Sequence, residues 1–321
     1  MKRREFIMLL GGMMLAPTAR LMGQPADRVY RIALLAPFPA RLMTAFFDEL
    51  RQQGFAEGQN LAIDHRGSEG NYDRFPALAA ELVKAAPDAI LCAGDAAIRA
   101  AQAATTTIPI VAATDDIVGS GLVRSLSHPG GNTTGVSLLA SDLDGKRQEI
   151  LIEFVPTARR MAALVDVKET GPSRLEALEA AARQRGVALV IQRVAASEDI
   201  EAAIAAASGA GALALNVLAS PLMHANRHAI IARTAALRLP AIYHWPETAQ
   251  EGGLLAYGPR FFEFYRQWAR QLVKVLRGAQ PADLPVEQPT KFELVINLKT
   301  AKALGLAIPP SVLARAHEVI E

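Results

Sequence analysis

The stretch LPVEQPTKFELVINLKTAKALGLAIPPSVLARAHEVIE, residues 284–321, is the most distinctive part of this 321-residue chain. Within it, residues 291–298 alternate apolar and polar side chains, which predicts a half-buried strand. Residues 299–304 are good helix formers, and Gly305 follows them at the position where a glycine commonly ends a helix. A pair of prolines then precedes a second short helix, which we expect over residues 311–320. The stretch therefore predicts one strand followed by two short helices.

This order of strand, helix, glycine and proline pair resembles the C-terminal signature of one bacterial family, the solute-binding proteins of ABC transporters that include a tryptophan-binding member. The turn SHPGGNTTG, residues 127–135, is also similar to a landmark of that family near its lobe boundary. The resemblance implies a type 1 periplasmic binding protein fold, in which a three-strand hinge joins two lobes. It also implies a small-molecule ligand in the cleft between the lobes and an ABC transporter permease as a partner.

Length and composition are those of an ordinary globular protein. A chain of 321 residues is long enough for two domains, because single cores stop growing near about 250–300 residues. The net charge is +2 and no basic stripe with interleaved aromatic residues occurs, so nucleic-acid binding is not predicted. The one cysteine, Cys92, lies in the apolar run AILCA and is expected to be a buried core residue.

Residues 1–26 have the pattern of a signal peptide. Lys2, Arg3 and Arg4 form a positive start, and an apolar run over residues 6–16 follows them. The run is shorter than the ~20 residues that a membrane-spanning helix needs. The arginine pair fits both the twin-arginine route and the general secretory route, so both routes stay open. We therefore expect a protein that is exported to the periplasm.

After the signal peptide, short apolar runs alternate with helical patterns in two successive series. Continuous apolar runs separated by helices are typical of parallel strands that are covered on both faces. The predicted fold class is therefore α/β, with two Rossmann-like lobes whose parallel sheets are flanked by helices. The predicted N-terminal lobe is residues 27–139 plus 253–284, and the predicted C-terminal lobe is residues 140–252 plus 285–321. The last of these boundaries is implied by the resemblance.

Candidate ligand contacts follow from the strand ends. In open parallel sheets, ligands bind beyond the carboxyl ends of the strands, where loops and helix N-termini converge. In the first lobe the candidates are Phe38, Asp95, Ala96, Thr114 and Asp115. In the second lobe they are Lys168, Glu169, Thr170, Asn216, Ser220, His244, Trp245 and Glu247, with Tyr257 at the cleft floor. Backbone amides at the helix starts suit a ligand carboxylate.

Several of these residues have a structural alternative, which stays open. Asp95 lies where a helix cap is expected, so capping competes with ligand contact. Asp115 can neutralise a ligand ammonium or lie in a surface loop. Trp245 can stack on a planar ligand or pack beneath its own loop. His224 and His228 have the i, i+4 spacing of a metal pair but lack the glutamate of a His-Glu-x-x-His site, so we expect two surface histidines.

No catalytic apparatus is predicted. The chain has no Gly-x-Ser-x-Gly elbow, no glycine-rich dinucleotide fingerprint after the first strand, and no recognisable cofactor or metal motif. We therefore expect the periplasmic solute-binding component of an ABC importer, a monomer that closes two lobes around its ligand. A sensory binding protein of the same fold and an α/β enzyme with an unrecognised site are the alternatives.

The predicted ligand is a small carboxylate-bearing molecule, an amino acid, with aromatic amino acids among the options. An aromatic carboxylate without an amine is the main rival, and a purine stays open. The segment HWPE, residues 244–247, departs from the Arg-Glu pattern of the family at this place, so the specificity of relatives is not carried over.

Overall fold

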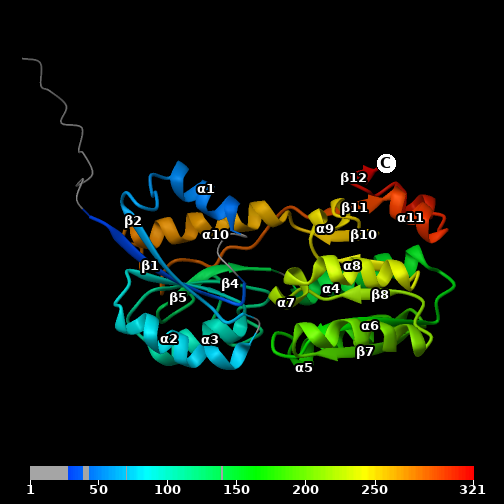
Figure 1. Ribbon diagram of the computed structural model, residues 1–321, viewed down its shortest axis with the longest axis horizontal. Helices are drawn as coiled ribbons and strands as arrows, with labels where there is room; N and C mark the ends of the chain where they lie inside the picture. The colour runs from blue at the N-terminus through cyan, green and yellow to red at the C-terminus, as the bar shows by residue number, and fades with distance from the viewer. Residues whose placement is uncertain (1–27, 39–42, 70, 139) are drawn as a thin grey trace, which may run out of the picture.

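The computed structural model describes residues 28–38, 43–69, 71–138 and 140–321. The predicted signal peptide, residues 1–26, lies outside the described residues. The described chain forms two lobes side by side, each built around one sheet with helices on both faces (Figure 1). This arrangement confirms the predicted α/β fold class. Within these residues, no helix combines the length and the apolar character needed to cross a membrane.

The first sheet contains five described strands in the order β2-β1-β3-β4-β5, all of them parallel. The strands are β1 (Tyr30–Ala36), β2 (Leu61–Gly67), β3 (Ala89–Ala93), β4 (Ile110–Thr114) and β5 (Thr133–Ser137). One face carries η2 (Tyr72–Arg74), α2 (Phe75–Lys84) and α3 (Asp95–Ala104), and the other carries α1 (Thr44–Gln52) and α10 (Phe261–Leu276) (Figure 1). Because both faces are covered, β3 and β4 are buried along their whole length.

The second sheet has the order β12-β11-β10-β9-β8-β6-β7 within the described chain, and only the β10–β11 pair is antiparallel there. Its strands are β6 (Arg160–Asp166), β7 (Ala188–Val194), β8 (Leu215–Val217), β9 (Ala241–Tyr243), β10 (Leu255–Gly258), β11 (Glu293–Asn297) and β12 (Glu318–Ile320). Its helices are α4 (Ala140–Phe154), α5 (Pro172–Gln184), η3 (Ser197–Asp199), α6 (Ile200–Gly209), α7 (Pro221–Ala225), α8 (Arg227–Ala236), α9 (Pro246–Gln250), α11 (Leu298–Leu304) and α12 (Pro310–Leu313).

The C-terminal stretch follows the sequence prediction until its last residues. β11 and α11 confirm the predicted strand and first helix, and Gly305 ends α11 with a left-handed φ of 71°. The second helix, predicted over residues 311–320, is wrong, because α12 ends at Leu313 and β12 pairs in parallel with β11. The backbone N–H of His317 donates to the carbonyl of Leu294 at 2.8 Å. The last residues therefore extend the sheet instead of continuing a helix.

The chain passes between the two sheets three times, after β5, between β10 and α10, and before β11. Two of the predicted lobe boundaries are displaced. Residues 255–258, predicted for the N-terminal lobe, form β10 in the second sheet. Gly258 permits this pairing, since a Cβ at that position would lie 2.0 Å from the carbonyl oxygen of His244. Residues 286–287, predicted for the C-terminal lobe, instead donate backbone hydrogen bonds to Leu126 and Gly135 of the first lobe.

The core of the first lobe extends from its sheet into α10. Trp268 of α10 is fully buried and donates its indole N–H to the carbonyl of Val111 in β4 at 3.0 Å. Cys92 is buried in β3, as predicted. Helix α10 therefore belongs to the first lobe although β10, directly before it in the chain, belongs to the second.

Candidate ligand-binding site

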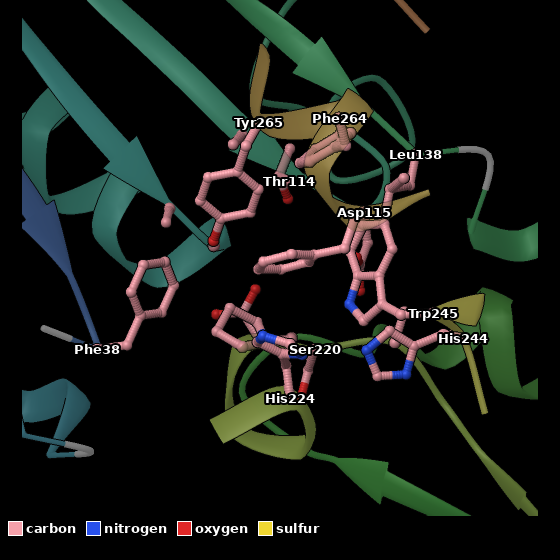
Figure 2. Close-up of a pocket in the computed structure, with 17 residues that line it drawn as sticks. Phe38, Thr114, Asp115, Leu138, Ser220, His224, His244, Trp245, Phe264 and Tyr265 are labelled. Carbon is pink, nitrogen blue, oxygen red and sulfur yellow. The ribbon is translucent and has the colours of Figure 1, made fainter. Parts of the chain in front are cut away.

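A cavity lies between the two lobes, beyond the carboxyl ends of their strands (Figure 2). The lobes leave a cavity of about 50 Å³, well below the ~300–1,000 Å³ range of small-molecule sites, so a ligand can enter only when the lobes open. The cavity brings together seven of the residues predicted from sequence, namely Phe38, Thr114, Asp115, Glu169, Ser220, His244 and Trp245. Both lobes therefore contribute to one site.

The first turn of α10 forms an aromatic wall of this cavity that the sequence did not indicate. Phe261, Phe264 and Tyr265 all line the cavity although each is buried. Trp245, which follows β9 of the second sheet, lies with its ring centroid 5.2 Å from that of Phe261 and 5.6 Å from that of Phe264. Helical periodicity predicts that this face is buried, but it cannot separate core rings from rings that line a cavity.

A second aromatic contact crosses between the lobes. His224 of α7 stacks on Phe261, with ring centroids 4.3 Å apart and an interplanar angle of 29°. The prediction of two surface histidines is therefore wrong for His224, which lines the cavity, whereas His228 is exposed. Burial lowers the pKa of His224 to about 3, and the charge of Arg227 contributes to this shift. The His224 ring is thus a neutral, flat surface at physiological pH.

His244 presents an unused polar ring to the cavity (Figure 2). Its side chain is 5% exposed, and neither ring nitrogen has a hydrogen-bond partner among the described residues. Burial and then the charge of Arg147 hold the pKa of His244 well below its usual range, and a loose contact with the backbone of Val217, outside good hydrogen-bond geometry, acts in the opposite direction. A neutral imidazole offers one donor and one acceptor, so His244 can serve a polar group of a ligand.

A buried ion pair joins the lobes at the edge of the cavity. Arg174 Nη1 of α5 lies 3.2 Å from Asp115 Oδ2, and Arg174 also pairs with Asp144. Burial raises the pKa of Asp115 to about 7, although Arg174 opposes that rise. Burial alone would lower the pKa of Arg174, but Asp144 and Asp115 outweigh it, so the guanidinium stays charged. The sequence did not indicate Arg174, because an arginine in the first turn of a helix resembles an ordinary surface residue.

Glu169 reaches from the second lobe to the N-terminus of α3 in the first. Its carboxylate accepts the backbone N–H of Asp95 at 2.7 Å and that of Ala96 at 3.5 Å. Gly94 leaves space for it, since a Cβ there would lie 2.9 Å from Glu169 Oε1. Burial and then the charge of Asp95 raise the pKa of Glu169 well above its usual range. Helix starts are the places predicted for a ligand carboxylate, and at α3 a protein carboxylate lies there instead.

Comparison with known proteins assigns this two-lobed architecture to a family. The sequence pattern described as ABC transporter substrate binding protein matches residues 39–320. The chain belongs to this family. A tyrosine-binding protein of Clostridioides difficile (strain R20291) is 26% identical over 266 residues, which cover 81% of this chain and 75% of that protein.

Two solved structures are similar over nearly the whole chain. A conserved domain protein from Vibrio cholerae has a TM-score of 0.83 and 26% identity, and covers 91% of this chain and 100% of its own. An ABC domain from Streptococcus pneumonia in complex with L-Trp has a TM-score of 0.81 and 25% identity, with the same coverage. These similarities confirm the type 1 periplasmic binding protein fold that the C-terminal resemblance implies.

Membership of this family also decides between binding and catalysis. Its members are substrate-binding proteins, so the chain is a binding protein and the α/β enzyme alternative is set aside. Among the residues that the structure describes, no group of three or more histidine, cysteine or acidic side chains is arranged to hold a metal ion. The cavity is therefore interpreted as a ligand-binding site.

Three predicted site residues, one in the first lobe and two in the loop between β6 and α5, lie beside the cavity and do not line it. Asp95 is the first residue of α3, and its carboxylate accepts a hydrogen bond from the Thr114 hydroxyl. The N-cap of α3 is Gly94 and not Asp95. Lys168 points to solvent and pairs with Asp73 of the opposite lobe at 3.2 Å. Thr170 is buried, and its hydroxyl has no hydrogen-bond partner among the described residues.

Three predicted residues of the second lobe support the cavity from behind. Asn216 is fully buried and donates to the backbone carbonyl of Asp144 at 3.2 Å. The carboxylate of Glu247 accepts the backbone N–H of Phe261 at 3.1 Å. The carbonyl of Tyr257 accepts a hydrogen bond from Arg147 at 3.0 Å. The side chains of Asn216, Glu247 and Tyr257 are not part of the cavity lining.

Proposed function

We propose that this protein is the periplasmic solute-binding component of an ABC importer, and that its ligand is an amino acid with an aromatic side chain. The observation that carries the ligand class is the cavity wall, in which aromatic rings from both lobes surround one space. Phe261, Phe264 and Tyr265 line it from the first lobe, and His224 and Trp245 line it from the second. The family and the ligands named for two relatives, tyrosine and L-Trp, support the same class.

The position of a ligand ring follows from the inter-lobe stacking. His224 and Phe261 face each other at 4.3 Å between centroids, which leaves no room for a third ring between them. Opening the lobes separates these two rings, and a planar ligand can then enter and stack on both. Burial of aromatic faces and ring stacking together favour such a ligand over an aliphatic one of similar size.

Closure of the lobes supplies the transport signal in this proposal. The two lobes already touch around the cavity through the Tyr72 hydroxyl, which donates to Asp166 at 3.2 Å, and through the Lys168–Asp73 pair. A ligand that contacts both lobes stabilises the closed state over the open state by its differential affinity. The permease would then distinguish loaded from empty protein by the shape of the closed form. The protein acts as a monomer in this scheme.

Thermal unfolding in the presence of candidate ligands tests the proposal. We would add L-tyrosine, L-tryptophan and L-phenylalanine to the purified protein, with L-leucine and D-glucose as matched controls. A ligand at 100 times its dissociation constant adds ~2.7 kcal/mol to the free energy of unfolding, which raises the melting temperature measurably. A shift with aromatic amino acids and none with the controls is expected. A shift with D-glucose or L-leucine alone would contradict the proposed ligand class.

A further inference from the structure

We propose that the cavity recognises an ammonium group on its aromatic ligand and does not require a carboxylate, so that aromatic amines bind at the same site. This inference rests on the proposed function, and it specifies the chemistry by which the aromatic ligand is held. It differs from the sequence prediction, in which a ligand carboxylate is the recognised group.

The first observation is the sign of the charge around the cavity. Asp115 and Glu169 line it, and no lysine or arginine is among the described residues that do so. Asp95 lies directly behind, where it accepts the hydroxyl of the lining residue Thr114. A ligand carboxylate would therefore meet no cation in this lining and would disfavour ionisation of Asp115 and Glu169, whereas a ligand ammonium would pair with their ionised forms.

The second observation is that the obvious anion site is already filled. The N-terminal amides of α3 would suit a ligand carboxylate, but Glu169 accepts hydrogen bonds from Asp95 and Ala96. The fit is close, because Gly94 lacks the Cβ that would meet Glu169 at 2.9 Å. A ligand carboxylate would have to displace Glu169 from these amides.

The nearest guanidinium group, that of Arg174, already has its partners within the protein. Arg174 pairs with both Asp144 and Asp115 and donates to the carbonyl of Ala219 at 3.4 Å. Asp115 must share this one cation with Asp144. Asp144 also pairs with the buried Arg147, but neither arginine pairs with Asp95 or Glu169. The four carboxyl groups of Asp95, Asp115, Asp144 and Glu169 thus outnumber the two guanidinium groups, which leaves a place for one more positive charge.

The third observation points independently to a bound polar aromatic group. His244 is 95% buried, lines the cavity, and makes only a loose contact with the backbone of Val217, with no hydrogen bond of good geometry at either ring nitrogen among the described residues. Such a group usually has a partner in the functional state of a protein. A phenol hydroxyl or an indole N–H can supply that partner. The ligand then carries its ammonium toward the acidic residues and its ring substituent toward His244.

Binding of an ammonium would displace protons from the acidic residues. The charged groups around Asp115 are Arg174, Asp144 and Asp95, and those around Glu169 are Asp95, Asp166 and Asp115. The hydroxyl of Tyr72 donates a hydrogen bond to Asp166. The neutral rings of His224 and His244 lie across the cavity. Burial favours the protonated form of Asp115 and Glu169 in the empty cavity. A ligand ammonium favours the ionised form, so binding at neutral pH releases protons to the buffer, and the affinity rises as the pH rises.

Calorimetry with three matched compounds tests the inference. L-Tyrosine has both groups, tyramine lacks only the carboxylate, and 3-(4-hydroxyphenyl)propionate lacks only the amine. We expect tyramine to bind within about tenfold of L-tyrosine or more tightly, and the propionate to bind at least about 30-fold more weakly, as for loss of one partner of a buried charge pair. Titrations in phosphate and Tris buffers at pH 7 should differ in apparent enthalpy for tyramine, which reports the released protons.

The outcomes separate this inference from the proposed function. Binding of the propionate without binding of tyramine would overturn the inference and leave the aromatic ligand class intact. Absence of binding by all three compounds and by the matching indole series (tryptophan, tryptamine, indole-3-propionate) would overturn both.

Two variants locate the ammonium contact. Asp115→Asn and Glu169→Gln are each expected to weaken tyramine at least about tenfold more than they weaken the propionate, and to reduce proton release. Asp116→Asn is the matched control, because it makes the same charge change one residue along, where the carboxylate caps Gly119 at 2.8 Å and does not line the cavity. Equal loss of both compounds in Asp115→Asn and Glu169→Gln would overturn the assignment, and the wild-type ligand series tests it even if a variant fails to fold.

Discussion

Arg174 of α5 lies 3.2 Å from Asp115 at the end of β4, which joins the two lobes by a buried ion pair at the edge of the cavity. Arg174 also pairs with Asp144, and Asp144 pairs with Arg147, which donates to the carbonyl of Tyr257 in β10. A continuous series of ion pairs and one hydrogen bond therefore links Asp115 at the cavity to β10, the strand after which the chain crosses back to the first lobe.

Removal of Arg174 is expected to destabilise the protein strongly. Arg174→Ala leaves Asp115 and Asp144 buried with fewer compensating charges, and breaking a buried pair in this way costs about 3–5 kcal/mol. Urea unfolding monitored by circular dichroism measures the change in the free energy of unfolding. Arg183→Ala, which removes a solvent-exposed pair with Glu179, is the control and is expected to have little effect. A loss no greater than in the control would contradict the inferred role of the pair.

Replacement of Trp245 separates packing from ligand contact. Trp245 is 6% exposed and packs with Phe261 and Phe264 while it also lines the cavity. Trp245→Ala is expected to reduce the free energy of unfolding by about 3–5 kcal/mol and to weaken ligand binding by about 1–3 kcal/mol. Trp245→Phe keeps an aromatic ring and should lose less of both. Calorimetry that shows unchanged affinity in Trp245→Ala would remove Trp245 from the ligand contacts.

The pH dependence of stability is expected to report the protonation of Asp115. Its pKa is raised from 3.8 to about 7, so the folded protein binds this proton more tightly than the unfolded chain does. The contribution to stability is therefore complete below about pH 3.8 and is lost as the pH rises through about 7. His224, whose pKa is lowered to about 3, has the opposite dependence between about pH 3 and 6.5.

Comparison of the wild-type protein with Asp115→Asn isolates this contribution, because the other groups are common to both. The free energy of unfolding of the wild type minus that of the variant should fall between pH 5 and pH 8, by an amount on the order of a few kcal/mol. Urea unfolding of the ligand-free proteins at both pH values gives the difference. A constant difference would show that Asp115 is ionised throughout this range.

The fold could be predicted largely from local pattern, because alternating apolar runs and helices determine parallel sheets without knowledge of tertiary contacts. The places where prediction failed depend on distant pairing. β12 is only three residues long and becomes a strand through its pairing with β11. β10 joins the second sheet for the same reason, since its partners are β9 and β11. Neither partner can be identified from the short segment itself.

The cavity was predictable in its strand-end residues and unpredictable in its helical ones. Thr114 and Asp115 could be proposed because the end of a parallel strand is a general binding position. His224 and Phe261 lie on helices, where a polar ring and an apolar ring give no sign that they meet across two lobes. Glu169 was predicted to face the ligand, but its contact with the start of α3 depends on how the lobes close.

The contact between Glu169 and α3 can be tested through Gly94, the residue on which Glu169 packs. Gly94 has a φ of +86°, and a Cβ there would lie 2.9 Å from Glu169 Oε1. Gly94→Ala therefore adds two effects, backbone strain and displacement of Glu169. Gly186→Ala is the matched control, because Gly186 also has a left-handed φ, of +70°, but a Cβ at that position would have no neighbouring atom within 4 Å.

If the Glu169 contact stabilises closure, Gly94→Ala should weaken ligand binding by about 1–2 kcal/mol more than Gly186→Ala, consistent with loss of a charge-assisted hydrogen bond. Calorimetry measures both affinities. Small-angle X-ray scattering should also show a larger radius of gyration for ligand-free Gly94→Ala, because the open state gains population. Equal affinities and equal radii in the two variants would mean that Glu169 caps α3 without contributing to closure.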